Sequence, residues 1–116
     1  MDVDYLFAML PVTDLGVAVE WYHRLLGRPP DMRPNDAEAT WRLTDSASIC
    51  LLEDVVHAGG GGVTVIVGNL DATLAGCADR GIPAVEPFEV GQAGRKAVLP
   101  DPDGNVVSVV ELSGPA

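Results

Sequence analysis

Apolar positions along the chain follow two different spacings, one helical and one typical of strands. Over residues 14–26 and 69–80, apolar side chains recur every three or four positions, as on the buried face of a helix. Asp14 and Asn69 stand at the starts of these stretches, where their side chains make good N-caps. A glycine follows each stretch as a stop. The pattern therefore predicts two helices.

Short runs rich in Val, Leu and Ile flank both helices and are predicted as strands. The first, Tyr5–Leu10, is apolar almost throughout, so we expect it to be covered on both faces. Residues 31–37 are typical of a turn. The predicted strands are 5–10, 38–43, 48–52 and 63–67, with a proline-interrupted edge segment over 82–90.

A closing hairpin is predicted around Asp101-Pro102-Asp103-Gly104-Asn105. Asp-Gly is a strong signal for a tight two-residue turn. The β-branched run behind it is a good strand, and Lys96–Leu99 supplies its partner. A two-residue turn here pairs Leu99 with Ser108.

The order strand, helix, three strands occurs twice, with an offset of about 55 to 58 residues between matching positions. We therefore expect an α+β fold in one domain spanning residues 1–116. It would consist of two tandem βαβββ modules, 3–53 and 63–112, joined by the glycine-rich linker 54–62. The modules would form a curved mixed sheet around a cleft, with the helices on the outer face.

Leu10-Pro11-Val12-Thr13-Asp14-Leu15 and the segment 101–105 resemble motifs of the vicinal oxygen chelate superfamily. That superfamily includes glyoxalase I, extradiol dioxygenases, fosfomycin-resistance enzymes and bleomycin-resistance proteins. The resemblance implies the paired βαβββ fold. It also implies four metal-ligand positions, two in each module, usually held by histidine and carboxylate side chains.

The four positions fall here on Phe7, Cys50, Gly62 and Ser108. One thiol and one hydroxyl are too few ligands for the divalent ions that metal-dependent members bind. We therefore predict that the chain binds no metal and needs no cofactor. His23 and His57 are expected on a helix surface and in the linker, away from this site.

Strand alternation extends the expected cleft beyond these positions. If Phe7 faces the cleft, so do Met9 and Thr64. If the loop over 44–47 has an even number of residues, Trp41 pairs with Cys50 and also faces the cleft. If the number is odd, Arg42 faces the cleft instead. The predicted ligand-binding residues are Phe7, Met9, Trp41, Cys50, Thr64, Leu99 and Ser108. No base or nucleophile with an orienting partner is evident, so no catalytic residue is predicted.

Charge and cysteine content narrow the possible partners. The formal net charge is −10, with 17 acidic against 7 basic side chains, which disfavours nucleic acid and anionic membranes. Cys50 and Cys77 have no CxxC spacing and are expected as free buried thiols in the cytoplasm. The N-terminus lacks the positive region of a signal peptide, and no apolar run is long enough to span a membrane.

Three functions are compatible with these observations. The first is a metal-free homodimer that resembles bleomycin-resistance proteins and sequesters an apolar, aromatic or cationic organic ligand. The second is a metal-dependent lyase or dioxygenase of the glyoxalase type, although the usual metal-binding side chains are missing from this sequence. The third is a non-catalytic structural or regulatory dimer whose own side chains fill the cleft.

Overall fold

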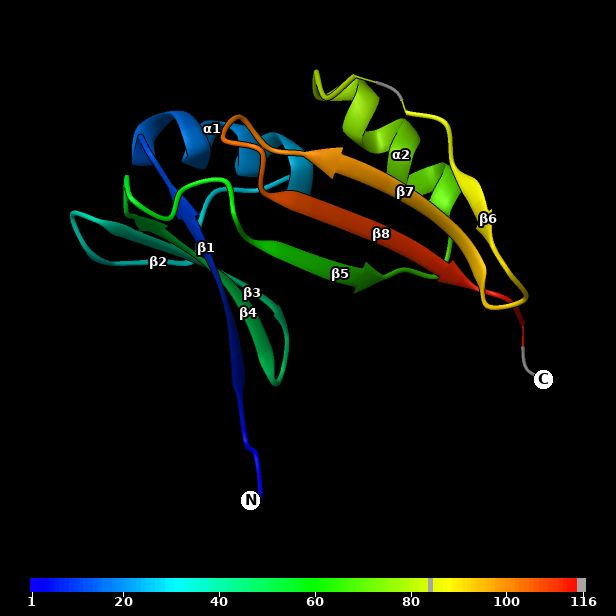
Figure 1. The fold of residues 1–116 in the computed structure, drawn as a ribbon, viewed down its shortest axis with the longest axis horizontal. Helices are drawn as coiled ribbons and strands as arrows, with labels where there is room; N and C mark the ends of the chain where they lie inside the picture. The colour runs from blue at the N-terminus through cyan, green and yellow to red at the C-terminus, as the bar shows by residue number, and fades with distance from the viewer. Residues whose placement is uncertain (84, 115–116) are drawn as a thin grey trace.

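The computed structural model describes residues 1–83 and 85–114, which form two helices and eight strands in two sheets (Figure 1). In chain order the elements are β1 Leu6–Val12, α1 Leu15–Leu26, β2 Met32–Asn35, β3 Glu38–Thr44, β4 Ala47–Glu53, β5 Gly62–Ile66, α2 Leu70–Asp79, β6 Phe88–Val90, β7 Gly94–Pro100 and β8 Val106–Leu112.

The two sheets have the same topology. Sheet one has the order β1-β4-β3-β2, and sheet two has the order β5-β8-β7-β6. In each sheet the first strand of the module pairs in parallel with the last, and the other pairs are antiparallel. Helix α1 packs on β3 and β4, and α2 packs on β7 and β8. The predicted α+β fold with a repeated βαβββ module is therefore confirmed.

Both helices begin and end as the sequence predicts. Asp14 Oδ1 accepts a hydrogen bond from Val17 N at 3.0 Å, and Asn69 Oδ1 accepts one from Ala72 N at 2.9 Å. Gly27 ends α1 in the left-handed region at φ 81°, where a side chain would be strained. These local signals agree with the observed helix boundaries.

Two edge segments differ from the sequence prediction. Residues expected as a turn form β2, since Asp31 N donates to Thr40 O and the Asp31 carboxylate accepts from Arg42 N at 2.7 Å. The proline-interrupted segment forms a strand only at Phe88–Val90. Both are edge strands, where pairing with a neighbour outweighs weak intrinsic propensity.

A β-bulge moves Trp41 away from its expected position. The predicted turn does form, because Thr44 pairs with Ala47, but Leu43 has no partner. The extra residue reverses the alternation beyond it, so Trp41 pairs with Ile49 and faces α1. The prediction that Trp41 faces the cleft is wrong.

Trp41 instead belongs to the core between α1 and sheet one. Its side chain is fully buried, and its Nε1 donates to Arg28 O at 2.9 Å. The Tyr22 ring lies 6.0 Å from it, centroid to centroid. Arg42 takes the face away from the helix, where it pairs with Ser48. The odd-loop alternative therefore describes the register correctly.

The closing hairpin shows a second register change. Pro100 pairs with Val106, which leaves a five-residue loop over 101–105 rather than a two-residue turn. Leu99 then pairs with Val107, and Val98 pairs with Ser108. Leu99 is buried on the helix side of sheet two, so its predicted place in the cleft is also wrong.

The loop is closed by the side chains of Asp101 and Asn105. Asp101 Oδ1 accepts from the backbone N–H groups of Asp103 and Asn105, both at 2.9 Å. Asp101 Oδ2 accepts from Asn105 Nδ2 and from the Tyr22 hydroxyl, also at 2.9 Å. Burial and then the Asp101 charge raise the pKa of Tyr22, so its hydroxyl stays a donor. The loop of module two is thus bonded directly to helix α1.

Asn105 connects the same loop to the rest of module one. Its Nδ2 donates to Pro11 O at 2.7 Å, and its Oδ1 accepts from Gly61 N at 2.7 Å. The linker lies close enough that a Cβ on Gly59 would meet Asp103 O at 2.3 Å. The glycine run therefore permits close backbone packing at this point.

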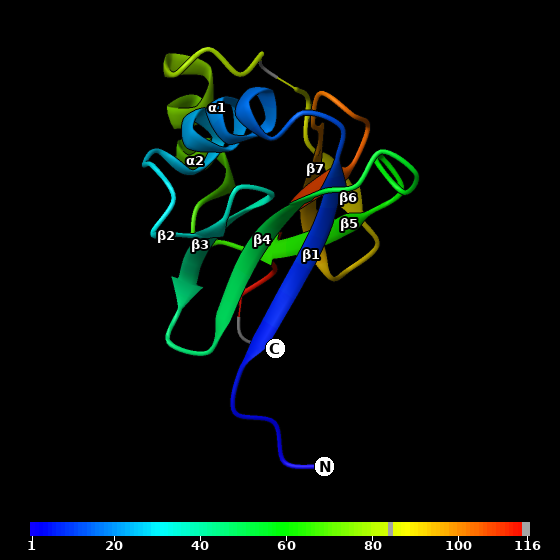
Figure 2. The ribbon, with the colours of Figure 1, turned by 90° about the vertical axis from the view of Figure 1, so that its left-hand side faces the viewer.

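The open faces of the two sheets do not cover each other within one chain. Figures 1 and 2 show the sheets diverging below the paired helices, with the first residues of the chain extending away from both. The radius of gyration is 14.5 Å, whereas a compact chain of this length has about 13 Å. Strand β1, predicted to be covered on both faces, leaves Leu6, Phe7 and Met9 about half exposed.

Replacing Asn105 should destabilise the fold more than replacing a helix cap. Asn105→Ala removes three side-chain hydrogen bonds, leaves Gly61 N without its partner, and should lower the free energy of unfolding by about 2 to 4 kcal/mol. Asn69→Ala, the matched control, removes one exposed cap and should cost about 1 kcal/mol. Urea unfolding of both variants measures the difference, and equal losses would contradict the account.

Candidate functional site

The face of sheet one turned away from α1 carries a hollow of about 430 Å³. That volume lies within the range of ordinary small-molecule sites. We call it the sheet-one hollow and define it by its lining residues: Phe7, Met9, Met32, Pro34, Glu38, Thr40 and Cys50.

Three large apolar side chains dominate this lining. Phe7, Met9 and Met32 are 54%, 47% and 55% exposed, although each is of a type that normally packs inside. The Tyr5 ring lies 4.9 Å from that of Phe7 at a tilt of 42°, and the Tyr5 hydroxyl hydrogen-bonds the Ser48 hydroxyl. The hollow therefore offers an aromatic surface and two flexible thioethers to an apolar ligand.

The polar part of the hollow comes from neighbouring strands. Cys50 Sγ donates to Glu38 Oε2 at 3.3 Å, and Asn35 Nδ2 donates to Glu38 Oε1 at 3.0 Å. The hydrogen bond from Asn35 and, to a smaller extent, the one from Cys50 lower the pKa of Glu38. Burial raises the pKa of Cys50. At neutral pH the site therefore contains a carboxylate and a protonated thiol.

The structure gathers only some of the predicted ligand-binding residues here. Phe7, Met9 and Cys50 line the sheet-one hollow. Thr64 and Ser108 pair with each other on the open face of sheet two. Trp41 and Leu99 face the helices, as described above. Ligand binding by the other five residues, which face away from the helices, remains a prediction.

Sequence reasoning missed Glu38, Thr40 and Met32. A signal was available in the third predicted strand, where Glu38, Thr40 and Arg42 alternate with Ala39, Trp41 and Leu43. Reading that alternation as polar outward and apolar inward gives the observed faces. Met32 carried no such signal, because the pairing of β2 with β3 is tertiary.

A second hollow, of about 290 Å³, lies between the two sheets. We call it the inter-sheet groove. Its lining combines β1, β3 and β4 with β5 and includes Leu6, Ala8, Ser48, Thr64 and Ile66. Of the predicted ligand-binding residues, Thr64 belongs to this lining.

The superfamily's metal positions do not fit a metal in this chain. They are occupied by Phe7, Cys50, Gly62 and Ser108, which offer one thiol and one hydroxyl. Among residues 1–83 and 85–114, no group of three or more His, Cys, Asp or Glu side chains is arranged to hold an ion. Hard and borderline divalent cations need more carboxylate or imidazole than these positions supply.

The nearest carboxylates on the same strands have another role. Glu53 Oε2 accepts from Leu15 N at 3.0 Å, and Glu111 Oε1 accepts from Leu70 N at 2.8 Å. Each lies at the end of the last strand of its module and caps the first turn of its helix. This repeated arrangement directs both carboxylates toward the helices.

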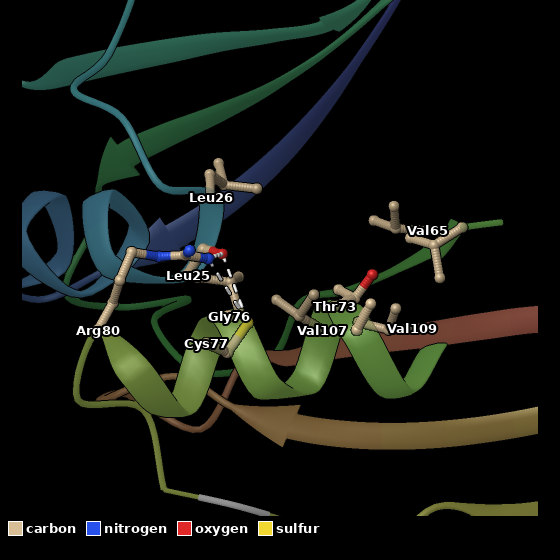
Figure 3. Close-up of a pocket in the computed structure, with 11 residues that line it drawn as sticks. Leu25, Leu26, Val65, Thr73, Gly76, Cys77, Arg80, Val107 and Val109 are labelled. Atoms are coloured by element: carbon tan, nitrogen blue, oxygen red, sulfur yellow. Dashed lines mark hydrogen bonds between the residues drawn. The ribbon is translucent and has the colours of Figure 1, made fainter. Parts of the chain in front are cut away.

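A third hollow, of about 320 Å³, lies between the two helices and sheet two (Figure 3). Its polar groups are already bonded: Arg80 Nη2 donates to Leu25 O at 3.0 Å, and Thr73 Oγ1 donates to Asn69 O at 2.8 Å. Figure 3 shows the Arg80 side chain lying across Gly76 toward α1. Arg80 therefore caps the end of α1, and the sheet-one hollow is the better candidate site.

Comparison with solved structures identifies the family. A glyoxalase/bleomycin resistance protein from Catenulispora acidiphila is 36% identical, with a TM-score of 0.89 over 97% of this chain and 100% of that chain. The chain belongs to the glyoxalase/bleomycin resistance protein family. A shared fold does not fix chemistry, so the donor set at the four positions is the observation that bears on metal binding.

More distant solved structures share the fold. TnmS3, an antibiotic-binding protein from a Streptomyces species, is 23% identical with a TM-score of 0.76 over 97% of each chain. A bleomycin-binding protein solved with bleomycin is 19% identical with a TM-score of 0.77 over 96% of this chain and 100% of that chain. No family model and no curated protein matches the chain. No helix in the described residues is long and apolar enough to cross a membrane.

Both thiols should react slowly in the folded protein. Burial raises the pKa of Cys50 and of Cys77, so the reactive thiolate is scarcer at neutral pH than in a free cysteine. Modification by a disulfide reagent should therefore accelerate only at a more alkaline pH, and both thiols should react at ordinary rates in urea. Fast reaction of the native protein at neutral pH would contradict this environment.

Proposed function

We propose that the protein is a metal-free small-molecule binding protein that sequesters an apolar, aromatic or cationic organic ligand. The observation that carries the proposal is the sheet-one hollow, which presents Phe7, Met9 and Met32 with a carboxylate. A concave apolar surface with a few polar groups is the usual form of a ligand site. Proteins that share the fold and are named for bleomycin and antibiotic binding also support the proposal.

The lost metal ligands favour binding over the lyase or dioxygenase alternative. Those reactions need a bound divalent ion, and the donor set at the four superfamily positions fits none. Within one chain the lining side chains leave the sheet-one hollow open, as a ligand site requires. The free thiols Cys50 and Cys77 support a reducing compartment, and we place the protein in the cytoplasm.

The proposal includes a homodimer. Strand β1 is the edge of sheet one, and its Leu6, Phe7 and Met9 side chains are half exposed on both faces. A second copy would cover this strand and the inter-sheet groove. It would also supply Thr64 and Ser108 from its own sheet two to complete a cleft opposite the sheet-one hollow.

Binding should depend on the aromatic wall of the hollow. We expect isothermal titration of the protein with acridine and proflavine, two planar aromatic probes, to detect binding of at least one. Phe7→Ala should weaken it about tenfold or more, because the ring supplies much of the contact surface. Val17→Ala, a control on the outer surface of α1, should bind like the parent. Failure of both probes to bind the parent protein would reject the proposal.

Dimerisation should depend on the exposed face of β1. Light scattering coupled to gel filtration should give twice the 12.1 kDa chain mass for the parent protein. Leu6→Glu should yield monomers, because it would bury a charge in the interface. Val17→Glu changes an equally exposed apolar residue on α1 and should stay dimeric. A monomeric parent protein would contradict the dimer.

A further inference from the structure

We propose that Glu38 makes the sheet-one hollow select ligands in which a positive charge is attached to a flat apolar body. The inference rests on the proposed binding function and deepens it. It replaces the broad class of apolar, aromatic or cationic ligands with one that must satisfy both surfaces of the hollow, the apolar wall and the carboxylate.

The position of Glu38 is fixed by two strands and a turn. It begins β3, where its backbone pairs with Leu52 of β4 on one side and Asn35 of β2 on the other. Its two carboxylate oxygens accept separately from Asn35 Nδ2 and Cys50 Sγ. The carboxylate is therefore held against the hollow and does not turn freely into solvent.

The negative charge of Glu38 has no cationic partner in the chain as described. The ion pairs among residues 1–83 and 85–114 involve other carboxylates. Arg42 is on the same face of β3, but its guanidinium donates to Thr44 O and Asp45 O, both at 3.2 Å. The groups that contact Glu38 are neutral donors, which orient the carboxylate without neutralising it.

The carboxylate keeps capacity for a ligand. A carboxylate has about four acceptor positions, and the structure fills two of them. Phe7, Met9 and Met32 line the same hollow. A ligand that places a ring on the apolar wall would bring an attached amino group toward Glu38.

A structural role for Glu38 gives a different expectation. If it only closes the β2–β3 turn through Asn35, removing its charge should affect charged and neutral ligands alike. If it selects cations, the loss should be confined to the charged ligand. Two probes with one ring system separate these cases: at neutral pH proflavine is cationic and acridine is uncharged.

The experiment is isothermal titration of the parent protein and Glu38→Gln with both probes at neutral pH. The parent should prefer proflavine, and Glu38→Gln should lower proflavine affinity about tenfold or more. Acridine affinity should change by no more than about twofold in the same variant. Glu38→Asp keeps the charge and should retain part of the preference.

Glu89→Gln is the matched control, because it removes the same charge from β6 at the edge of the other sheet. It should leave both affinities unchanged, which separates a local contact from the overall field of the net charge of −10. If both probes bind the parent and Glu38→Gln leaves their ratio unchanged, only this inference fails. If neither probe binds the parent, the proposed function fails with it.

Discussion

The buried pair of Asp101 and Asn105 holds the two modules in place. The two side chains close the β7–β8 loop and also reach helix α1, the end of β1 and the glycine-rich linker. Three of these contacts join residues more than forty positions apart in the chain. Because the Asp101 and Asn105 side chains are buried, their polar atoms must all find partners, which makes the relation between the modules specific.

This fixed relation determines which surfaces are available for function. The helices lie together on one side, so both sheets present their other faces outward (Figure 1). On sheet one that face includes a hollow with an aromatic wall and a carboxylate. On sheet two it carries Thr64 and Ser108. The same repeated architecture uses Glu53 and Glu111 as helix caps. Carboxylates at the ends of these strands therefore stabilise the fold.

The sequence was sufficient for the helices, their caps and the repeated module, because each depends on local spacing and on one or two capping residues. It was insufficient for two registers. The bulge at Leu43 and the five-residue loop at 101–105 each shift a strand by one residue, which turned Trp41 and Leu99 to the opposite face. Loop length is a weak guide where side chains such as Asp101 reshape a turn. The alternation over residues 38–43 indicates the face on which Glu38 lies, but its bonds with Asn35 and Cys50 form only in the folded sheet and could not be predicted.

The most direct test of binding in the sheet-one hollow uses the three methionines as reporters. Protein labelled with ¹³C at the methionine methyl groups would be titrated with proflavine and followed by NMR. Met9 and Met32 line the hollow, whereas Met1 is fully exposed at the chain end. The account predicts ring-current shifts of the Met9 and Met32 signals and none for Met1. Proflavine binding that leaves the Met9 and Met32 signals unmoved would contradict it.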